Sequence, residues 1–154
     1  MKNNQKRTSF ENKKTSKKSR VKENPESFFD NNPTWKFDMV DFDHSKWNIE
    51  SCDLNRSQLF KKLRDFERMK WRDIIQTYGG KNRGTNHHYI DFRDMIQEAQ
   101  ERAKELNIVE HTDRLFSLRL QGKIRLFGIL TDGIFRIVWY DNDHDICPSK
   151  LKNT

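Results

Sequence analysis

The order of apolar and polar positions predicts an α+β domain, with a strand and helices followed by an antiparallel meander. Between residues 34 and 41, Trp35, Phe37 and Met39 fall at alternate positions, which is typical of a half-buried strand. Apolar residues then recur at helical spacing from residue 57 to residue 78 and again from residue 92 to residue 106. Three further strands are expected at residues 114–120, 123–130 and 133–141.

Turn and capping residues give these elements their limits. Ser57 is a good N-cap for the first helix, Gly79 and Gly80 end the next helical stretch, and Asp91 can cap the last helix. Asp132-Gly133 is a strong signal for a two-residue hairpin between the last two strands. We therefore predict an N-terminal strand and two to three helices, packed on one face of a C-terminal antiparallel three-stranded meander.

The register of the meander decides which side chains share a face, because side chains alternate along a strand. With Asp132-Gly133 as the turn, one face is apolar and is expected to lie under the helices. A three-residue loop at 121–123 places Arg119 opposite Arg125 on the other face. That face is expected to be open and to combine an apolar floor with these polar residues: Ser117, Arg119, Arg125, Arg136 and Tyr140.

The distribution of charge separates an N-terminal segment from the rest of the chain. The chain has 154 residues and a net charge of +7, and residues 1–24 hold nine Lys or Arg against two Glu. The remaining residues are therefore neutral overall, so an anion site there depends on local placement of cations. We expect residues 1–27 to be a disordered basic tail and residues 28–154 to form a single α+β domain. The tail either solubilises the protein or grips phosphates.

The sequence predicts a cytoplasmic protein. No apolar run approaches the roughly 20 residues of a membrane-spanning helix, and the basic N-terminus lacks the apolar stretch of a signal peptide. Cys52 and Cys147 are far apart and lack the spacing of a metal site. A reduced protein is the simpler interpretation, and a disulfide is the alternative.

The C-terminal segment RLFSLRLQGKIRLFGILTDGIFRIVWYDNDHDICPS resembles the end of an uncharacterised family of small bacterial proteins that are often carried on mobile elements. The shared ending is an aromatic residue, Asp, two variable residues and His, here Tyr140, Asp141 and His144. The resemblance extends over residues 35–154, and it implies no established activity.

A second resemblance is to RelE/ParE-like toxins, which have a strand, two helices and an antiparallel meander with a basic hairpin. The residues that carry it are Leu118, Arg119, Leu120, Gly122 and Arg125. It implies a metal-free ribonuclease that cuts mRNA on the ribosome and has an antitoxin as its protein partner. The chain departs from these toxins in its length, its basic tail and its acidic DNDHD ending.

Metal-free RNA cleavage needs a base, an acid and cations that stabilise the extra charge on the phosphate. The candidate catalytic residues are Arg119 and Arg125 as cations and Tyr140 or His144 as the groups that move protons, with Asp141 or Asp145 orienting His144. The candidate nucleic-acid-binding residues are Lys81, Arg83, His87, His88, Lys123 and Arg136.

Two further segments have partial metal-binding patterns. Histidines 87 and 88 with Asp91 and His111 can form a metal-nuclease centre, although adjacent strand residues point to opposite faces. The run after Tyr140 starts like a calcium loop but has Ile146 where the loop needs glycine. We expect no metal, no small-molecule cofactor and no membrane partner. The alternatives to a toxin acting on RNA are a non-enzymatic nucleic-acid-binding module and a protein-interaction module of a mobile element.

Overall fold

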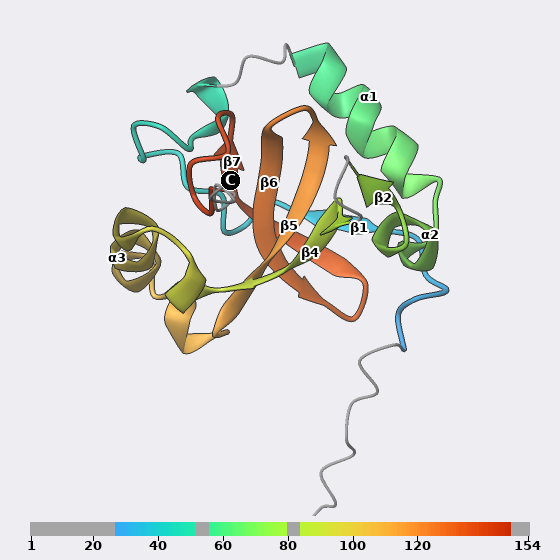
Figure 1. Cartoon of the computed structure of the whole chain (residues 1–154). Coiled ribbons are helices and arrows are strands. Elements are labelled where there is room, and N and C mark those ends of the chain that lie inside the picture. The colour runs from blue at the N-terminus through green and yellow to red at the C-terminus, as the bar shows by residue number, and fades with distance from the viewer. Residues whose placement is uncertain (1–26, 52–55, 80–83, 149–154) are drawn as a thin grey trace, which may run out of the picture.

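A computed structural model describes residues 27–51, 56–79 and 84–148, and its centre is a five-stranded mixed sheet (Figure 1). The strands are β1 (Thr34–Lys36), β4 (His87–Asp91), β5 (Arg114–Gln121), β6 (Ile124–Thr131) and β7 (Ile134–Asp141). Their order across the sheet is β1-β7-β6-β5-β4, with β1 parallel to β7 and the other neighbours antiparallel. The α+β class is confirmed, and the expected meander is the β5-β6-β7 part of a wider sheet.

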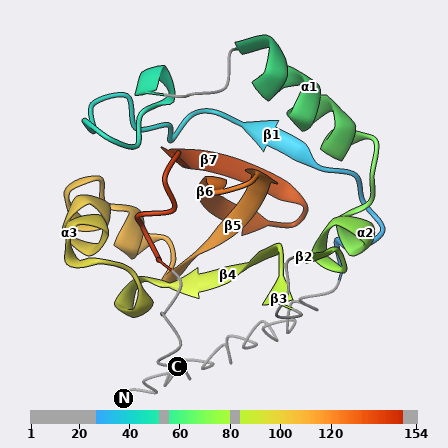
Figure 2. The same cartoon turned by 45° about the horizontal axis from the view of Figure 1, so that its top comes forward.

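Helices lie on both sides of this sheet (Figure 2). The α-helices are α1 (Arg56–Glu67), α2 (Trp71–Ile75) and α3 (Gln97–Glu105), and the 3-10 turns are η1 (Ile49–Ser51), η2 (Phe92–Asp94) and η3 (Ile108–Glu110). Two short strands, β2 (Tyr78–Gly79) and β3 (Gly84–Thr85), pair with each other apart from the main sheet. The expectation that all helices cover one face is wrong, because α1 and α2 lie on one side and α3 on the other.

Each face of the sheet has its own hydrophobic core. On the side that we call the helix face, Leu59 and Leu63 of α1 and Trp71 of α2 pack against Phe116 and Leu126. On the side that we call the arginine face, which carries Arg119 and Arg125, the small side chains of Ala99 and Ala103 let α3 approach the strands closely. Its buried partners there include Leu115, Phe127, Val138 and Trp139.

A β-bulge in the β6–β7 pair explains why the predicted register fails beyond Gly128. Leu130 pairs with Phe135 and Gly128 pairs with Ile137, as a two-residue turn at Asp132-Gly133 requires, but Phe127 then pairs with Trp139. The strand β7 therefore has one extra residue at this point, and every later side chain changes face. Tyr140 consequently lies opposite Leu126 in the helix-face core, whereas Asp141 takes the place opposite Arg125.

Gly128 is required at this bulge because the opposite strand approaches it closely. A Cβ placed on Gly128 would lie 2.3 Å from the carbonyl oxygen of Arg136 and 3.0 Å from a ring carbon of Phe135.

We expect Gly128→Ala to lower the free energy of unfolding by about 1–3 kcal/mol, as overpacking does in other cores. Urea denaturation measures this loss, and Gly122→Ala is a poor control because its φ is +51°. Ser117→Ala, a small residue on neighbouring β5, is the better comparison. Equal stability of wild type and Gly128→Ala would contradict the close approach.

Candidate functional site

Arg119 and Arg125 lie opposite each other on β5 and β6, as the register predicted. The loop that joins them differs from the prediction: Gln121 pairs with Ile124, so Gly122 and Lys123 form the turn and a bulge falls between Arg119 and Gln121. The Gly122 carbonyl accepts hydrogen bonds from both guanidiniums, from Nε of Arg119 at 2.9 Å and from Nη1 of Arg125 at 2.8 Å. One backbone oxygen thus holds the two cations together as an arginine pair.

The charge of the arginine pair is only partly balanced, by the Asp141 carboxylate that lies opposite Arg125 on β7. Within the part of the chain that the structure describes, no Asp or Glu oxygen lies within 4.0 Å of Arg119 or Arg125. The other partner of Arg119 is neutral, since its Nη1 donates to Oδ1 of Asn86 at 2.8 Å. Burial, followed by the positive charge of Arg119, lowers the pKa of Arg125 to about 10, and the negative charge of Asp141 opposes this shift in part. An anion bound between the two guanidiniums would relieve this repulsion.

The two adjacent histidines of β4 fall on opposite faces, as adjacent strand residues must. His88 pairs with Ser117, so it is exposed on the arginine face, whereas His87 pairs with Leu118 on the helix face. There the His87 ring packs edge-on against Phe66, with the centroids 5.5 Å apart.

His87 has a structural environment. Its Nδ1 accepts the backbone N–H of Arg119 at 3.0 Å, and only 4% of the residue is exposed. Burial, together with the charges of Arg125, His88 and Arg119, lowers the pKa of His87 to about 4. The ring is therefore neutral near pH 7 and turned away from the arginine pair, so the predicted nucleic-acid contact through His87 is not supported by its position.

The loop after β7 brings His144 to the same region. Asp141 is fully buried opposite Arg125, and its two carboxylate oxygens accept the N–H groups of Asp145 and Ile146, each at 3.0 Å. These bonds fold the chain back on itself, with His144 at a left-handed φ of +60°. Burial raises the pKa of Asp141, and the two N–H donors oppose that rise.

The ionisation of His144 links it to the arginine pair. Burial lowers the pKa of His144, the charge of Arg125 lowers it further, and Asp141 acts in the opposite direction. His88 and Arg119 also lower it. His144 is half-buried, and the charges of both arginines and of His88 act on its ring. The predicted partnership of His144 with Asp141 thus has a specific form: the carboxylate holds the loop backbone.

The remaining predicted site residues lie elsewhere. Tyr140 is 2% exposed on the helix face, so its predicted catalytic role is not supported by its position. Arg136 pairs with Ile129, four residues along β6 from Arg125, and it forms an ion pair with Asp38 through two nitrogens. Lys123 is exposed at the hairpin turn beside the pair. Lys81 and Arg83 lie outside the described residues, as do Cys52 and all of the expected tail except Ser27.

Two features of this region went unrecognised in the sequence. Asn86, which fixes the Arg119 guanidinium, stands in a polar loop with no distinguishing pattern. The bulge that exchanges Tyr140 for Asp141 did have a signal, because a glycine inside a strand pattern often marks a bulge. Gly128 is that glycine.

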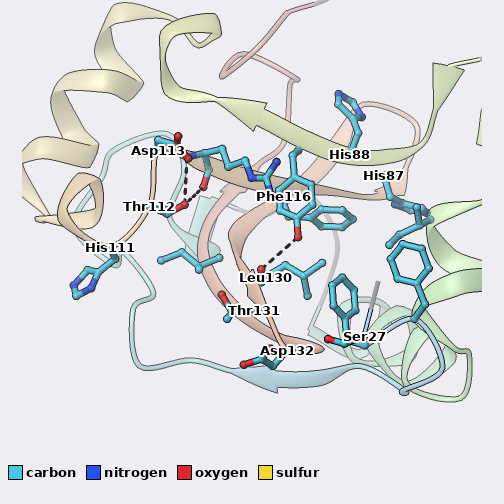
Figure 3. Close-up of a pocket in the computed structure, with 16 residues that line it drawn as sticks. Ser27, His87, His88, His111, Thr112, Asp113, Phe116, Leu130, Thr131 and Asp132 are labelled. Carbon is cyan, nitrogen blue, oxygen red and sulfur yellow. Dashed lines mark hydrogen bonds between the residues drawn. The ribbon is translucent and has the colours of Figure 1, made fainter. Parts of the chain in front are cut away.

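A cavity of about 760 Å³ lies at another place, on the helix face where β5 and β6 diverge (Figure 3). Phe28, Phe116 and Leu130 contribute to its apolar lining. The guanidinium of Arg114 is stacked 3.9 Å from the centre of the Tyr89 ring, and the Tyr89 hydroxyl donates to the carbonyl of Leu130 at 3.4 Å. His87, His88 and His111 lie at its lining, but neither arginine of the pair does. We therefore place the candidate site at the arginine pair, where partly balanced cations and titratable groups converge.

No three His, Cys, Asp or Glu side chains among the described residues converge as metal ligands, and His87 and His88, half of the alternative metal centre, point to opposite faces. None of the described helices has the length and apolar character to cross a membrane. The comparisons with known proteins found no matching family model, no matching curated protein and no matching solved structure.

Proposed function

We propose that this protein acts on RNA in the manner of a RelE/ParE-like toxin and holds the phosphodiester backbone with its arginine pair. The observation that carries the proposal is the pair itself: Arg119 and Arg125 share the Gly122 carbonyl and have no carboxylate within 4.0 Å among the described residues. Guanidiniums arranged side by side suit the oxygens of a phosphate, which accept two parallel hydrogen bonds.

The fold is compatible with this proposal. The chain runs from β1 through α1 and α2 to the antiparallel β5-β6-β7 meander, which is the element order that the resemblance implies. The strand β4 and helix α3 are additions to that order, and they bring His88 and the second core. A ribosome as the site of action and an antitoxin as protein partner belong to the same proposal.

We expect Arg119→Ala/Arg125→Ala to weaken binding of a single-stranded 2′-O-methyl RNA by tenfold or more. Neutralisation of the one phosphate that the pair holds would be lost, so the slope of log affinity against log salt should fall by about 0.7, the value for one phosphate of a single strand. Fluorescence anisotropy over a salt series measures both quantities. Arg72→Ala/Arg136→Ala is the matched control, because it removes the same charge from guanidiniums already paired with Asp30 and Asp38. Equal loss in both double variants would contradict a specific site.

The alternative is a non-enzymatic nucleic-acid-binding module that works through the basic segment at residues 1–24. The observation that favours it is that the whole net charge of +7 resides there. A full-length variant with its nine basic residues of that segment replaced by glutamine separates the two functions. A toxin that acts on RNA should slow bacterial growth when it is expressed. If the arginine pair is the site, the glutamine variant still slows growth, whereas Arg119→Ala/Arg125→Ala does not.

A further inference from the structure

The arginine pair lies between two histidines, His88 on β4 and His144 in the loop that follows β7. Across the sheet, β7 ends at Asp141 before the His144 loop, β6 carries Arg125 and β5 carries Arg119. On β4, His88 pairs with Ser117, which is two residues from Arg119 along β5 and on the same face. Neighbouring strands are about 4.8 Å apart, so a phosphate on the two central arginines has β4, which carries His88, on one side and β7, which leads into the His144 loop, on the other.

We propose that His88 and His144 are a general acid–base pair that cleaves single-stranded RNA at a phosphodiester held by Arg119 and Arg125. This proposal rests on the proposed RNA binding and adds the reaction, the two groups that move protons and the substrate requirement. In-line displacement at phosphorus places the attacking and leaving oxygens on opposite sides. Two imidazoles that flank a phosphate site meet that requirement, whereas two on one side would not.

His144 is suited to act as the base. It is half-buried, and the groups that face it are Arg125 from β6, Arg119 from β5, His88 from β4 and Asp141 from β7. Burial and then Arg125 lower the pKa of His144, so its ring is neutral near pH 7 and can accept a proton. The Asp141 carboxylate acts as a positioning residue, because it fixes the N–H groups of Asp145 and Ile146 directly after His144.

His88 is left to act as the acid. Its side chain is exposed on the arginine face beside Ser117, within reach of a bound RNA strand. The negative charge of a phosphate seated on the arginine pair favours the protonated form of an adjacent imidazole. A protonated His88 can then donate its proton to the leaving oxygen.

The reaction consumes only the RNA itself. The 2′-oxygen forms a bond to phosphorus while His144 takes the 2′-hydroxyl proton, and the bond from phosphorus to the 5′-oxygen breaks while His88 gives that oxygen a proton. The products are a 2′,3′-cyclic phosphate and a 5′-hydroxyl. Arg119 and Arg125 stabilise the additional negative charge on the phosphate oxygens in the transition state. Proton exchange with water returns both histidines to their starting forms.

The test uses the full chain with a fluorescent single-stranded RNA and its fully 2′-O-methylated counterpart, in buffer that contains EDTA. Gel analysis gives the cleavage rate, mass spectrometry identifies the new ends, and anisotropy gives the affinity for the methylated RNA. The variants are His88→Ala and His144→Ala, with His111→Ala as the control for an exposed histidine outside the site. Thermal denaturation of each variant reports whether the fold is retained.

We expect the wild type to leave 2′,3′-cyclic phosphate and 5′-hydroxyl ends. Loss of either site histidine should lower kcat by about 100-fold or more, as removal of an acid or base does. Both variants should bind the methylated RNA as the wild type does, and His111→Ala should cleave normally. For the wild type, kcat/KM should fall as the pH drops through the pKa of His144, because the base is then protonated.

Other results separate the two proposals. If the wild type binds the methylated RNA through the arginine pair but leaves the unmodified RNA intact, the RNA-binding function stands and the acid–base pair is overturned. Cleavage that leaves 5′-phosphate ends, requires added metal or survives in His88→Ala or His144→Ala also overturns it. If the methylated RNA does not bind, the proposed function itself fails.

Discussion

Replacing Asp41 by asparagine is expected to remove about 3–5 kcal/mol from the free energy of unfolding, the usual cost of breaking a buried ion pair. The Asp41 carboxylate is 1% exposed and accepts two bonds of 2.8 Å from the Arg102 guanidinium. It also accepts the indole N–H of Trp139 at 3.0 Å and the backbone N–H of Asp43 at 3.1 Å. An asparagine amide would turn a donor toward this set of donors and leave Arg102 with only the exposed Glu105 carboxylate as its anionic partner.

The pH dependence of this contribution follows from the direction of the pKa shift. Burial alone would raise the pKa of Asp41, but the bonds from Arg102, Trp139 and the Asp43 N–H outweigh it and bring the pKa to about 2. A carboxylate with a lowered folded-state pKa stabilises the fold above its unfolded pKa of about 3.9 and loses that contribution as the pH falls toward 2. The stability difference between wild type and Asp41→Asn should therefore be full at pH 7 and shrink below pH 4.

Urea denaturation at several pH values measures this difference. Asp38→Asn is the matched control, since Asp38 also binds an arginine, Arg136, but its side chain is 42% exposed. An exposed ion pair contributes little to stability, so the denaturation midpoint should hardly move. A loss in Asp38→Asn equal to that in Asp41→Asn, or a loss in Asp41→Asn that persists at pH 2, would contradict the buried pairing.

Replacing Trp71 by alanine is expected to cost about 3–5 kcal/mol of folding free energy, as truncation of a large buried aromatic does. The residue is fully buried at the start of α2, and its ring packs at an angle against Trp35, Phe116 and Phe135. Its indole N–H donates to the carbonyl of Gly133 at 2.9 Å. The side chain thus joins α2, β1 and the β6–β7 turn.

Two further variants divide this loss into its parts. Trp71→Phe keeps an aromatic ring but removes the indole donor, and the Gly133 carbonyl retains a bond from the Thr34 N–H. We therefore expect Trp71→Phe to cost less than Trp71→Ala. Its cost should be about 1 kcal/mol for the lost hydrogen bond, added to the cost of the smaller ring. Phe60→Ala on α1 is the control, because Phe60 is 64% exposed. A similar loss in Phe60→Ala would mean that helix packing in general, and not this junction, sets the stability.

The hydrophobic pattern was sufficient for the parts of the fold that depend on neighbours in the sequence. The three strands of the meander, the Asp132-Gly133 turn and the opposition of Arg119 and Arg125 follow from alternation and turn chemistry. The stripe that contains Ala99 and Ala103 likewise predicted a helix packed closely on a sheet. The pattern did not say which face α3 covers, because both faces of this sheet are apolar over part of their length.

Only part of the candidate site could be predicted from the sequence pattern. Arg119, Arg125 and His144 were identified from the hairpin and the C-terminal ending, but Tyr140 was placed on the wrong face because a single bulged residue inverts every position after it. His87 and His88 are indistinguishable as letters in the sequence. Only the pairing of β4 with β5 decides that His88 lies on the arginine face and His87 in the core.

The sequence by itself determined the α+β class, the cross-strand arginines and the confinement of net charge to residues 1–24, since each depends on local spacing or on composition. The tertiary structure decided the rest: the addition of β1 and β4 to the sheet, the α3 layer, the exchange of Tyr140 for Asp141, and the approach of His88 and His144 to the arginine pair. These depend on contacts between residues far apart in the chain, where strand pairing and a one-residue bulge fix positions that no local pattern encodes.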